Sequence, residues 1–196
     1  MFELILQNVS KHIQLTDEEK EYFISILKPK KLRRRQYLAQ AGEPCRHECF
    51  ITKGCLRQYY VDDNGSERIL AFAIEDYWMS DMHALITGEG ALTNIDALED
   101  SELVLIEKKA FEELLIRVPR IERFFRIILQ RAFVSHQRRI IENISLQADE
   151  RYKRFLERHP ALEQRLPQKQ IAAYLGITAE SLSRIRRQRL EGTKKT

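Results

Sequence analysis

Residues 168–187, QKQIAAYLGITAESLSRIRR, set the fold of the last quarter of the chain. Gly176 readily takes the left-handed backbone conformation that ends a helix, and Thr178 is a suitable N-cap for the next one. Ala172 is small enough to let two helices approach closely. Apolar positions on both sides of the glycine follow helical spacing: Ile171, Leu175, Ile177, Leu182 and Ile185. The stretch therefore predicts a helix-turn-helix. The alternative, a helical hairpin with a solvated basic face, does not require this whole set of positions.

The second helix of this motif would turn six side chains outward: Ala179, Glu180, Ser181, Ser183, Arg184 and Arg187. In a helix-turn-helix that face enters the major groove of DNA. There a glutamate accepts a hydrogen bond from a cytosine amino group, and an arginine pairs with two acceptors of a guanine. We expect Lys169, Arg186 and Arg189 to contact phosphates instead. Thr178, at the start of the helix, is also a candidate DNA-binding residue.

The distribution of charge points to the same end of the chain. The 196 residues include 33 Lys and Arg against 29 Asp and Glu, a net charge of +4. Residues 151–196 hold 12 basic and 4 acidic residues, a net of +8, whereas residues 1–150 have a net charge of −4. Such asymmetry predicts a polyanionic partner, most often a nucleic acid. On charge alone, a solvated basic tail is the alternative.

The composition excludes other classes of protein. No run approaches the roughly 18 apolar residues of a transmembrane helix, and the start of the sequence lacks the pattern of a signal peptide. The 3 cysteines are an odd number, which argues for a reducing compartment and against a disulfide framework. We therefore expect a cytoplasmic protein with no membrane partner.

From Lys31 to about Leu105, short β-rich runs alternate with turn residues. The runs are YLAQ (37–40), CFIT (49–52), CLRQYYV (55–61) and RILAFAI (68–74). Asn64-Gly65 lies between the last two and predicts a hairpin with a type I′ turn, which needs positive φ at both residues. Strands of this length and spacing predict a small antiparallel barrel or jelly roll.

A long helix is predicted to begin near Pro119. Apolar residues recur in it at spacings of 4, 3 and 4, at Ile121, Phe125, Ile128 and Ala132. Further apolar residues lie on other sides of the helix: Phe124, Ile127, Phe133, Ile140, Ile141 and Ile144. Such a helix needs two surfaces to bury against, namely its own β-domain and an identical helix from a second subunit. The residues of the first stripe are therefore candidates for dimerisation. The alternative is a helix buried wholly within one domain.

With these parts in this order, the chain resembles the Crp/Fnr family of transcription regulators over nearly its whole length. FITKGCLRQYYVDDNGSERILAF (50–72) is similar to the hairpin in the family's β-roll, and ITAESLSRI (177–185) is similar to its recognition helix. The resemblance implies an α+β fold with an N-terminal antiparallel β-roll (jelly roll), a long dimerisation helix and a C-terminal helix-turn-helix domain. It also implies that Glu180 and Arg184 read bases, whereas Ala179 replaces the first arginine of the family's pattern.

The resemblance implies three segments: a cyclic-nucleotide-binding-like β-roll effector domain (1–115), the dimerisation helix (116–147) and the helix-turn-helix DNA-binding domain (148–196). Family DNA-binding domains usually carry a β-hairpin wing after the recognition helix. In this sequence Glu191 to Thr196 follow Leu190, and six residues are too few for a hairpin. We therefore expect a nearly all-helical DNA-binding domain with little or no wing.

The family's cyclic-nucleotide site differs in this chain. Relatives use a Gly-Glu pair and an arginine, and these fall here at Ser80-Asp81 and near Ala91 to Thr93. No Lys or Arg occurs from Ile69 to Glu107, while nine acidic residues do. Such a field strongly disfavours a buried phosphate. We expect no cAMP binding in the usual mode.

A small-molecule effector of unknown identity remains a candidate partner. Trp78, Ser80 and Asp81 could line a pocket in the roll, although aromatic clusters in small barrels more often form core. By resemblance, His136 and Gln137 lie near the place where relatives put polar ligand contacts on the long helix. The spacing of the cysteines, the isolated histidines and the absence of catalytic motifs predict no metal, no cofactor and no enzymatic activity.

These observations predict a sequence-specific transcription regulator. It would act as a homodimer on a near-palindromic site in double-stranded DNA, with two recognition helices in successive major grooves. The alternative is a ligand-sensing adaptor that acts through protein partners, with a degenerate helix-turn-helix. Ala179 and the missing wing favour the adaptor, whereas the +8 charge of residues 151–196 and the pair Glu180 and Arg184 favour DNA binding.

Overall fold

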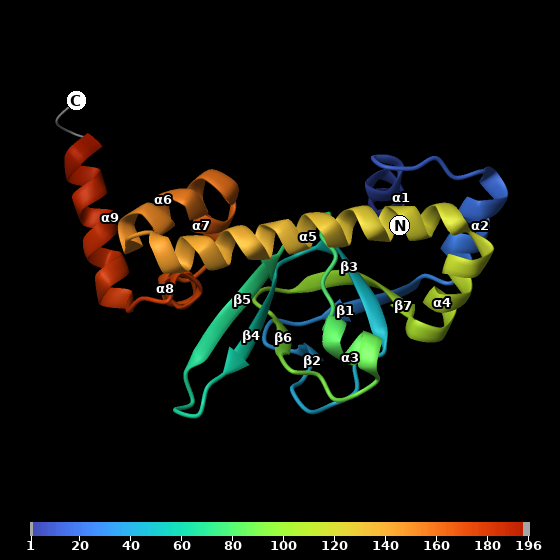
Figure 1. Ribbon diagram of the computed structural model, residues 1–196, viewed down its shortest axis with the longest axis horizontal. Coiled ribbons are helices and arrows are strands. Elements are labelled where there is room, and N and C mark those ends of the chain that lie inside the picture. Colours follow the sequence, from blue (N-terminus) through green and yellow to red (C-terminus); the bar gives the residue numbers. More distant parts are fainter. Residues whose placement is uncertain (1, 194–196) are drawn as a thin grey trace. The chain divides into compact units, whose positions relative to one another are not determined.

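The computed structural model describes residues 2–193, which form helices and antiparallel sheets as predicted (Figure 1). The chain divides into two compact units. Of the described residues, the roll unit comprises 2–60 and 70–132, and the C-terminal unit comprises 61–69 and 133–193. The tip of a β-hairpin and the second half of a long helix therefore belong to the same unit as the helix-turn-helix.

Two sheets form the centre of the roll unit, with strand orders β1-β7-β3 and β2-β6-β4-β5. The strands are β1 (Lys28–Leu32), β2 (Tyr37–Ala39), β3 (His47–Lys53), β4 (Leu56–Val61), β5 (Glu67–Ala73), β6 (Asn94–Ala97) and β7 (Ser101–Glu107). The helices of this unit are α1 (Glu3–Ser10), α2 (Asp17–Ser25), α3 (Met82–Thr87), α4 (Lys108–Arg117) and the first half of α5 (Pro119–Ser145). The antiparallel register of β1 with β7 and of β4 with β6 confirms the predicted roll.

The β4–β5 hairpin forms where Asn64-Gly65 predicts it, but its turn differs. Gly65 has a φ of +75°, whereas Asn64 is not among the residues with positive φ, so the turn is not type I′. Backbone hydrogen bonds close the turn, from the Gly65 N–H to the Asp62 carbonyl (2.8 Å) and from the Asp62 N–H to the Ser66 carbonyl (3.0 Å). The Asp62 carboxylate adds two more, because it accepts from the backbone N–H groups of Asn64 (3.1 Å) and Ser66 (2.9 Å).

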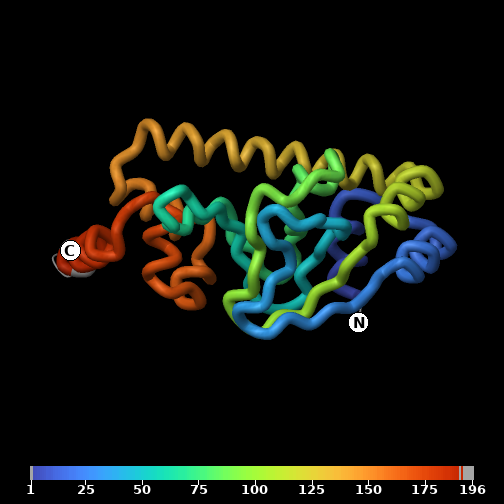
Figure 2. Tube along the Cα trace, turned by 90° about the horizontal axis from the view of Figure 1, so that it is seen from below, coloured from blue at the N-terminus to red at the C-terminus, as the bar shows by residue number. Residues whose placement is uncertain are grey.

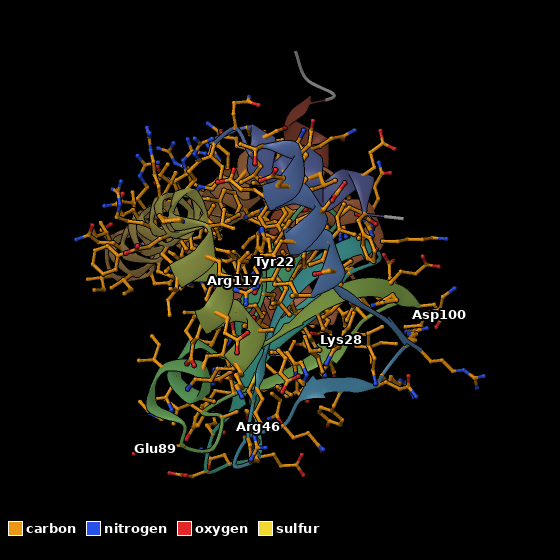
Figure 3. The ribbon with its side chains drawn as sticks, turned by 90° about the vertical axis from the view of Figure 1, so that its right-hand side faces the viewer. Tyr22, Lys28, Arg46, Glu89, Asp100 and Arg117 are labelled. Atoms are coloured by element: carbon orange, nitrogen blue, oxygen red, sulfur yellow. The ribbon has the colours of Figure 1, made fainter. Side chains whose placement is uncertain are left out.

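The core of the roll unit consists of two clusters. Inside the roll, residues such as Ile51 and Ile95 pack together, and both are fully buried. A second cluster, which includes Phe23, joins α1, α2, α4 and the start of α5 to the strands. The Arg117 guanidinium lies 4.8 Å above the Tyr22 ring and links α4 to α2 (Figure 3).

Helix α5 runs without a break from the roll unit into the C-terminal unit (Figures 1 and 2). Ile121 and Phe125 are 0% and 7% exposed in the second cluster, and Ile128 packs against it, while Ala132 is exposed. The protein's own chain therefore covers Ile121 and Phe125, two of the four residues predicted to mediate dimerisation. The exposed large apolar residues of α5 lie further along the helix: Leu129, Phe133, Val134, Ile140, Ile141 and Ile144.

The C-terminal unit continues as helices α6 (Ala148–Arg158), α7 (Leu162–Arg165), α8 (Gln168–Leu175) and α9 (Ala179–Thr193). Tyr152, Phe155, Leu162, Ile171 and Leu182 are among its buried side chains. No strand lies between residues 148 and 193, so the described part of this domain is all-helical, as predicted. None of the helices in the described chain is both long and apolar enough to cross a membrane.

A buried ion pair joins β4 to β6. The Arg57 Nε and Asp96 Oδ1 atoms are 2.7 Å apart, Nη2 donates to Oδ2 at 2.9 Å, and both side chains are less than 10% exposed. The guanidinium also lies 4.1 Å above the Tyr59 ring. Loss of one partner of such a pair leaves a buried charge without its counterion.

We predict that Asp96→Asn lowers the free energy of unfolding by about 3 kcal/mol in urea denaturation. The matched control is Glu102→Gln, because Glu102 pairs with Lys31 at 3.2 Å on the surface. Glu102→Gln should lower the free energy of unfolding by less than about 1 kcal/mol. Equal losses in the two variants would contradict the importance of the buried pair.

A second buried acid lies on β3. Glu48 is 7% exposed and accepts a hydrogen bond from the Ser80 hydroxyl at 2.9 Å. Burial raises the pKa of the Glu48 carboxyl above its ordinary value of 4.5, and the Ser80 hydrogen bond only partly opposes this. The folded protein therefore holds this proton to a higher pH than the unfolded chain does. The stability that Glu48 contributes is complete below pH 4.5 and is lost as the pH rises through the folded pKa.

Glu48→Gln should accordingly be more stable than the wild type at about pH 8, with a smaller difference near the ordinary glutamate pKa. Glutamine keeps an acceptor for the Ser80 hydroxyl but cannot ionise. Urea denaturation of both proteins at the two pH values measures the difference. A gain that does not grow with pH would show that the carboxyl titrates normally.

Candidate nucleic-acid interface

The turn between α8 and α9 forms as the sequence predicts. Gly176 adopts the left-handed conformation with a φ of +67°, and the Ile177 N–H donates to the Ala172 carbonyl at 3.0 Å. The Thr178 hydroxyl accepts a hydrogen bond from the Ser181 N–H at 3.2 Å and so caps α9. Leu182 is 0% exposed and fixes α9 against the rest of the unit. The local geometry is that of a helix-turn-helix.

Helix α9 presents most of the predicted residues to solvent. Thr178, Ala179, Glu180, Ser183, Arg184 and Arg187 are exposed, and Ser181 is half-buried. Lys169 is exposed on α8. The Arg187 Nε also donates to the Glu191 carboxylate at 3.0 Å, one turn further along. Most of the predicted residues therefore lie exposed on α9, with Thr178 just before it and Lys169 near the start of α8.

Glu180 lies in the first turn of α9. Its own backbone N–H and the Thr178 hydroxyl hydrogen-bond its carboxylate and hold its pKa below the ordinary value of 4.5. The side chain is therefore an ionised hydrogen-bond acceptor at neutral pH. An acceptor at the start of a recognition helix suits a base edge that presents a donor, such as the amino group of cytosine.

Arg186 has a different environment from the one expected for a phosphate contact. It is half-buried, and its guanidinium lies 3.7 Å from the Glu163 carboxylate. Tyr152 donates its hydroxyl hydrogen to the same carboxylate at 2.5 Å, and burial together with this hydrogen bond raises the pKa of Tyr152 to about 12. Arg186 therefore connects α9 to α6 and α7 within the unit.

Two arginines that no sequence pattern marks contact the end of α8. The Arg139 Nη2 donates to the carbonyls of Ile69 (2.6 Å) and Tyr174 (3.3 Å). Arg151 donates to the carbonyls of Leu146 (2.8 Å) and Leu175 (3.0 Å). Because the partners are backbone oxygens, no residue type in the sequence marks these contacts, and both arginines look like ordinary residues of a solvated helix face.

The candidate effector residues of the roll unit have structural partners. The Trp78 ring packs against Phe50, Phe124 and Phe125, with ring centroids 4.9–6.0 Å away. Ser80 hydrogen-bonds Glu48, as described above. Trp78 is half-buried and packs against the second core cluster.

Asp81 is 2% exposed and caps helix α3. Its carboxylate accepts hydrogen bonds from the Ala84 N–H (3.0 Å), the Thr93 N–H (3.1 Å) and the Thr93 hydroxyl (2.6 Å). His136 and Gln137 belong to the C-terminal unit and are exposed on α5.

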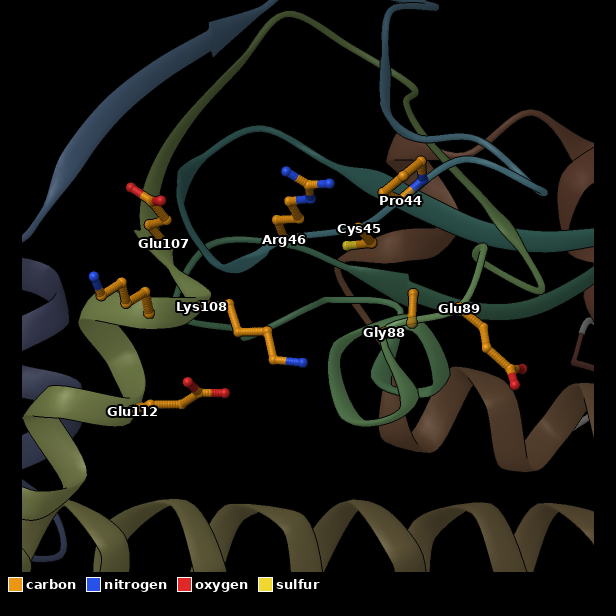
Figure 4. A pocket seen from close by; sticks show the side chains of 10 residues that line it. Pro44, Cys45, Arg46, Gly88, Glu89, Glu107, Lys108 and Glu112 are labelled. Atoms are coloured by element: carbon orange, nitrogen blue, oxygen red, sulfur yellow. The ribbon is translucent and has the colours of Figure 1, made fainter.

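A pocket of about 260 Å³ lies at the end of β7 in the roll unit (Figure 4). Arg46, Lys108, Glu89 and Glu112 are among its lining residues, so both signs of charge face it. None of the five candidate effector residues lines this pocket. Cys45 lines it and is half-buried, whereas Cys49 and Cys55 are buried, and burial raises the pKa of the Cys49 thiol.

Comparisons with known proteins agree with this architecture. Residues 29–117 match the family model of the cyclic nucleotide-binding domain. No curated protein sequence matches the chain. Among solved structures, the global regulator CLP from Xanthomonas campestris has a TM-score of 0.75 and 16% sequence identity, with 90% of this chain and 93% of that chain covered.

Two further structures show the same fold. FixK2 from Bradyrhizobium japonicum has a TM-score of 0.72 at 19% identity, with 85% of this chain and 86% of that chain covered. A putative transcriptional regulator of the Crp/Fnr family from Eubacterium rectale has a TM-score of 0.72 at 18% identity, with 91% of this chain and 85% of that chain covered. Residues 29–117 are thus similar to the cyclic nucleotide-binding domain, and the chain as a whole has the fold of these three structures.

Proposed function

We propose that this protein is a sequence-specific DNA-binding transcription regulator that acts as a homodimer. One observation carries the proposal: a capped helix-turn-helix exposes Glu180, Ser183 and Arg184 together at the start of α9. This helix lies in residues 151–196, whose net charge of +8 favours a polyanion. We further propose that the protein works in the cytoplasm and catalyses no reaction.

In this mechanism the first turns of α9 enter the major groove. The ionised Glu180 carboxylate accepts from an exposed base amino group, and Arg184 donates to two acceptors of a guanine. Lys169 contacts a phosphate and adds affinity without sequence information. Two such helices about 34 Å apart would read the two halves of a near-palindromic site.

The dimer would form through α5. Its exposed apolar side chains, such as Phe133, Ile140 and Ile144, recur at helical spacing and are 59–81% exposed. A second copy of the same helix would cover them, as in other isologous helical interfaces. In this proposal residues 1–115 form the effector domain, 116–147 the dimerisation helix and 148–196 the DNA-binding domain.

We also propose that cAMP does not bind in the mode usual for relatives. The Asp81 carboxylate already caps α3 and accepts from Thr93, at the position where a cyclic phosphate would need donors. Residues 69–107 contain nine acidic side chains and no Lys or Arg. A phosphate beside the buried Asp81 carboxylate would meet negative charge.

Arg184→Ala should weaken binding to the preferred operator by about 1–3 kcal/mol and relax the preference at one base pair of each half-site, because the bidentate contact to a base is lost. Competition binding with every single-base variant of the operator measures both effects. Arg126→Ala is the control, since Arg126 is an exposed arginine of the roll unit. An equal loss on all sequences would show that Arg184 contacts only phosphate.

Lys169→Ala should lower affinity to the same extent on every sequence and reduce the salt slope of binding by about one. Binding is measured over a series of salt concentrations on the operator and on unrelated DNA. Lys30→Ala, at an exposed position on β1, should leave both quantities unchanged. A selective loss on the operator would instead assign Lys169 to base recognition.

A further inference from the structure

Two half-buried arginine side chains contact the C-terminal end of α8, the first helix of the helix-turn-helix. Arg139 of α5 donates to the Tyr174 carbonyl, and Arg151 of α6 donates to the Leu175 carbonyl. The last carbonyls of a helix have no partner within the helix and carry its negative dipole end. Positive donors from two other helices therefore satisfy α8 where it turns towards α9.

Arg139 makes a further contact that Arg151 does not make. Its Nη2 donates to the carbonyl of Ile69 on the β4–β5 hairpin at 2.6 Å, and its guanidinium lies 4.1 Å above the Tyr174 ring. One side chain thus joins the hairpin tip (61–69), the second half of α5 and α8. All three segments belong to the C-terminal unit.

The surroundings strengthen these contacts. Burial lowers the pKa of Arg139 from its ordinary value, which records the cost of keeping its charge away from water. Hydrogen bonds from a charged donor in such surroundings are stronger than bonds between neutral groups. The planar Arg139 guanidinium stacks on the Tyr174 ring and also donates hydrogen bonds, so it fixes the orientation of α8 as well as its distance from α5. A lysine ammonium cannot do this, because it is not planar.

We propose that Arg139 is a positioning residue for DNA recognition, which fixes the direction of α8 and α9 relative to α5 and couples that direction to the β4–β5 hairpin. This inference rests on the proposed function. Arg139 would touch no base. Its loss would change the spacing between the two half-sites that a dimer accepts, and leave the sequence of each half-site unchanged.

We expect the helix-turn-helix to fold without Arg139, because helices α6–α9 have buried side chains of their own. Those that are 0–2% exposed include Tyr152, Phe155, Leu162, Ile171 and Leu182. The Gly176 turn and the Thr178 cap are local. A variant without the Arg139 guanidinium should therefore keep a folded helix-turn-helix whose orientation relative to α5 is less restricted.

The first experiment is selection from a random pool of double-stranded DNA by four full-length proteins: wild type, Arg139→Ala, Arg139→Lys and Arg138→Ala. Arg138 is the exposed neighbour of Arg139 on α5, so its variant loses the same charge. We expect wild type and Arg138→Ala to enrich one half-site at one spacing. Both Arg139 variants should enrich the same half-site over several spacings. Their affinity for DNA with the spacing that the wild type prefers should fall about tenfold or more.

A second measurement needs no DNA. Hydrogen–deuterium exchange of the same four proteins should show faster exchange in residues 61–69 and at the end of α8 in both Arg139 variants. Protection at Leu182 should stay at the wild-type level, which separates loss of positioning from unfolding of the unit.

The outcomes distinguish the two proposals. Unchanged spacing in the Arg139 variants, or unchanged exchange in the hairpin, overturns the inference and leaves the proposed function standing. If the wild type enriches no DNA, the proposed function fails, and with it the role of Arg139 in DNA recognition. A changed half-site sequence in Arg139→Ala would also overturn the inference, because it would assign Arg139 to base reading.

Discussion

The burial of the first turns of α5 under the roll is the contact on which the rest of the structure depends. Ile121 and Phe125 lie in the same cluster as Phe23, so the roll unit's own chain covers this end of the helix. Because α5 is one unbroken helix, its second half then carries the C-terminal unit and exposes apolar residues such as Phe133 and Ile144. The helix therefore contributes buried residues to the core of the roll unit and exposed apolar residues to the surface of the C-terminal unit.

Where the structure depends on local chemistry, the sequence predicts it well. Gly176 and Thr178 end one helix and begin the next through contacts within a few residues. The β-roll follows from short alternating strands. The hairpin turn is a partial exception, because Asn64-Gly65 locates it but does not form the predicted type I′ turn. The Asp62 carboxylate, three positions before the glycine, adds two hydrogen bonds to the turn.

The sequence does not predict which apolar surface of α5 the same chain covers, or which groups the arginine side chains contact. Helical periodicity places Ile121 and Phe125 on one stripe but does not distinguish cover by the same chain from cover by a partner. Arg57 meets Asp96 across 39 positions of sequence, and Arg139 meets backbone carbonyls. Such pairs depend on the tertiary fold, so propensity and spacing do not reveal them.

Selection of genomic DNA fragments by the purified full-length protein, with no ligand added, shows whether the exposed face of α9 reads DNA sequence. We expect enrichment of a near-palindromic sequence with two half-sites one helical turn apart. Absence of DNA binding at low salt would contradict it and favour an adaptor that acts through protein partners.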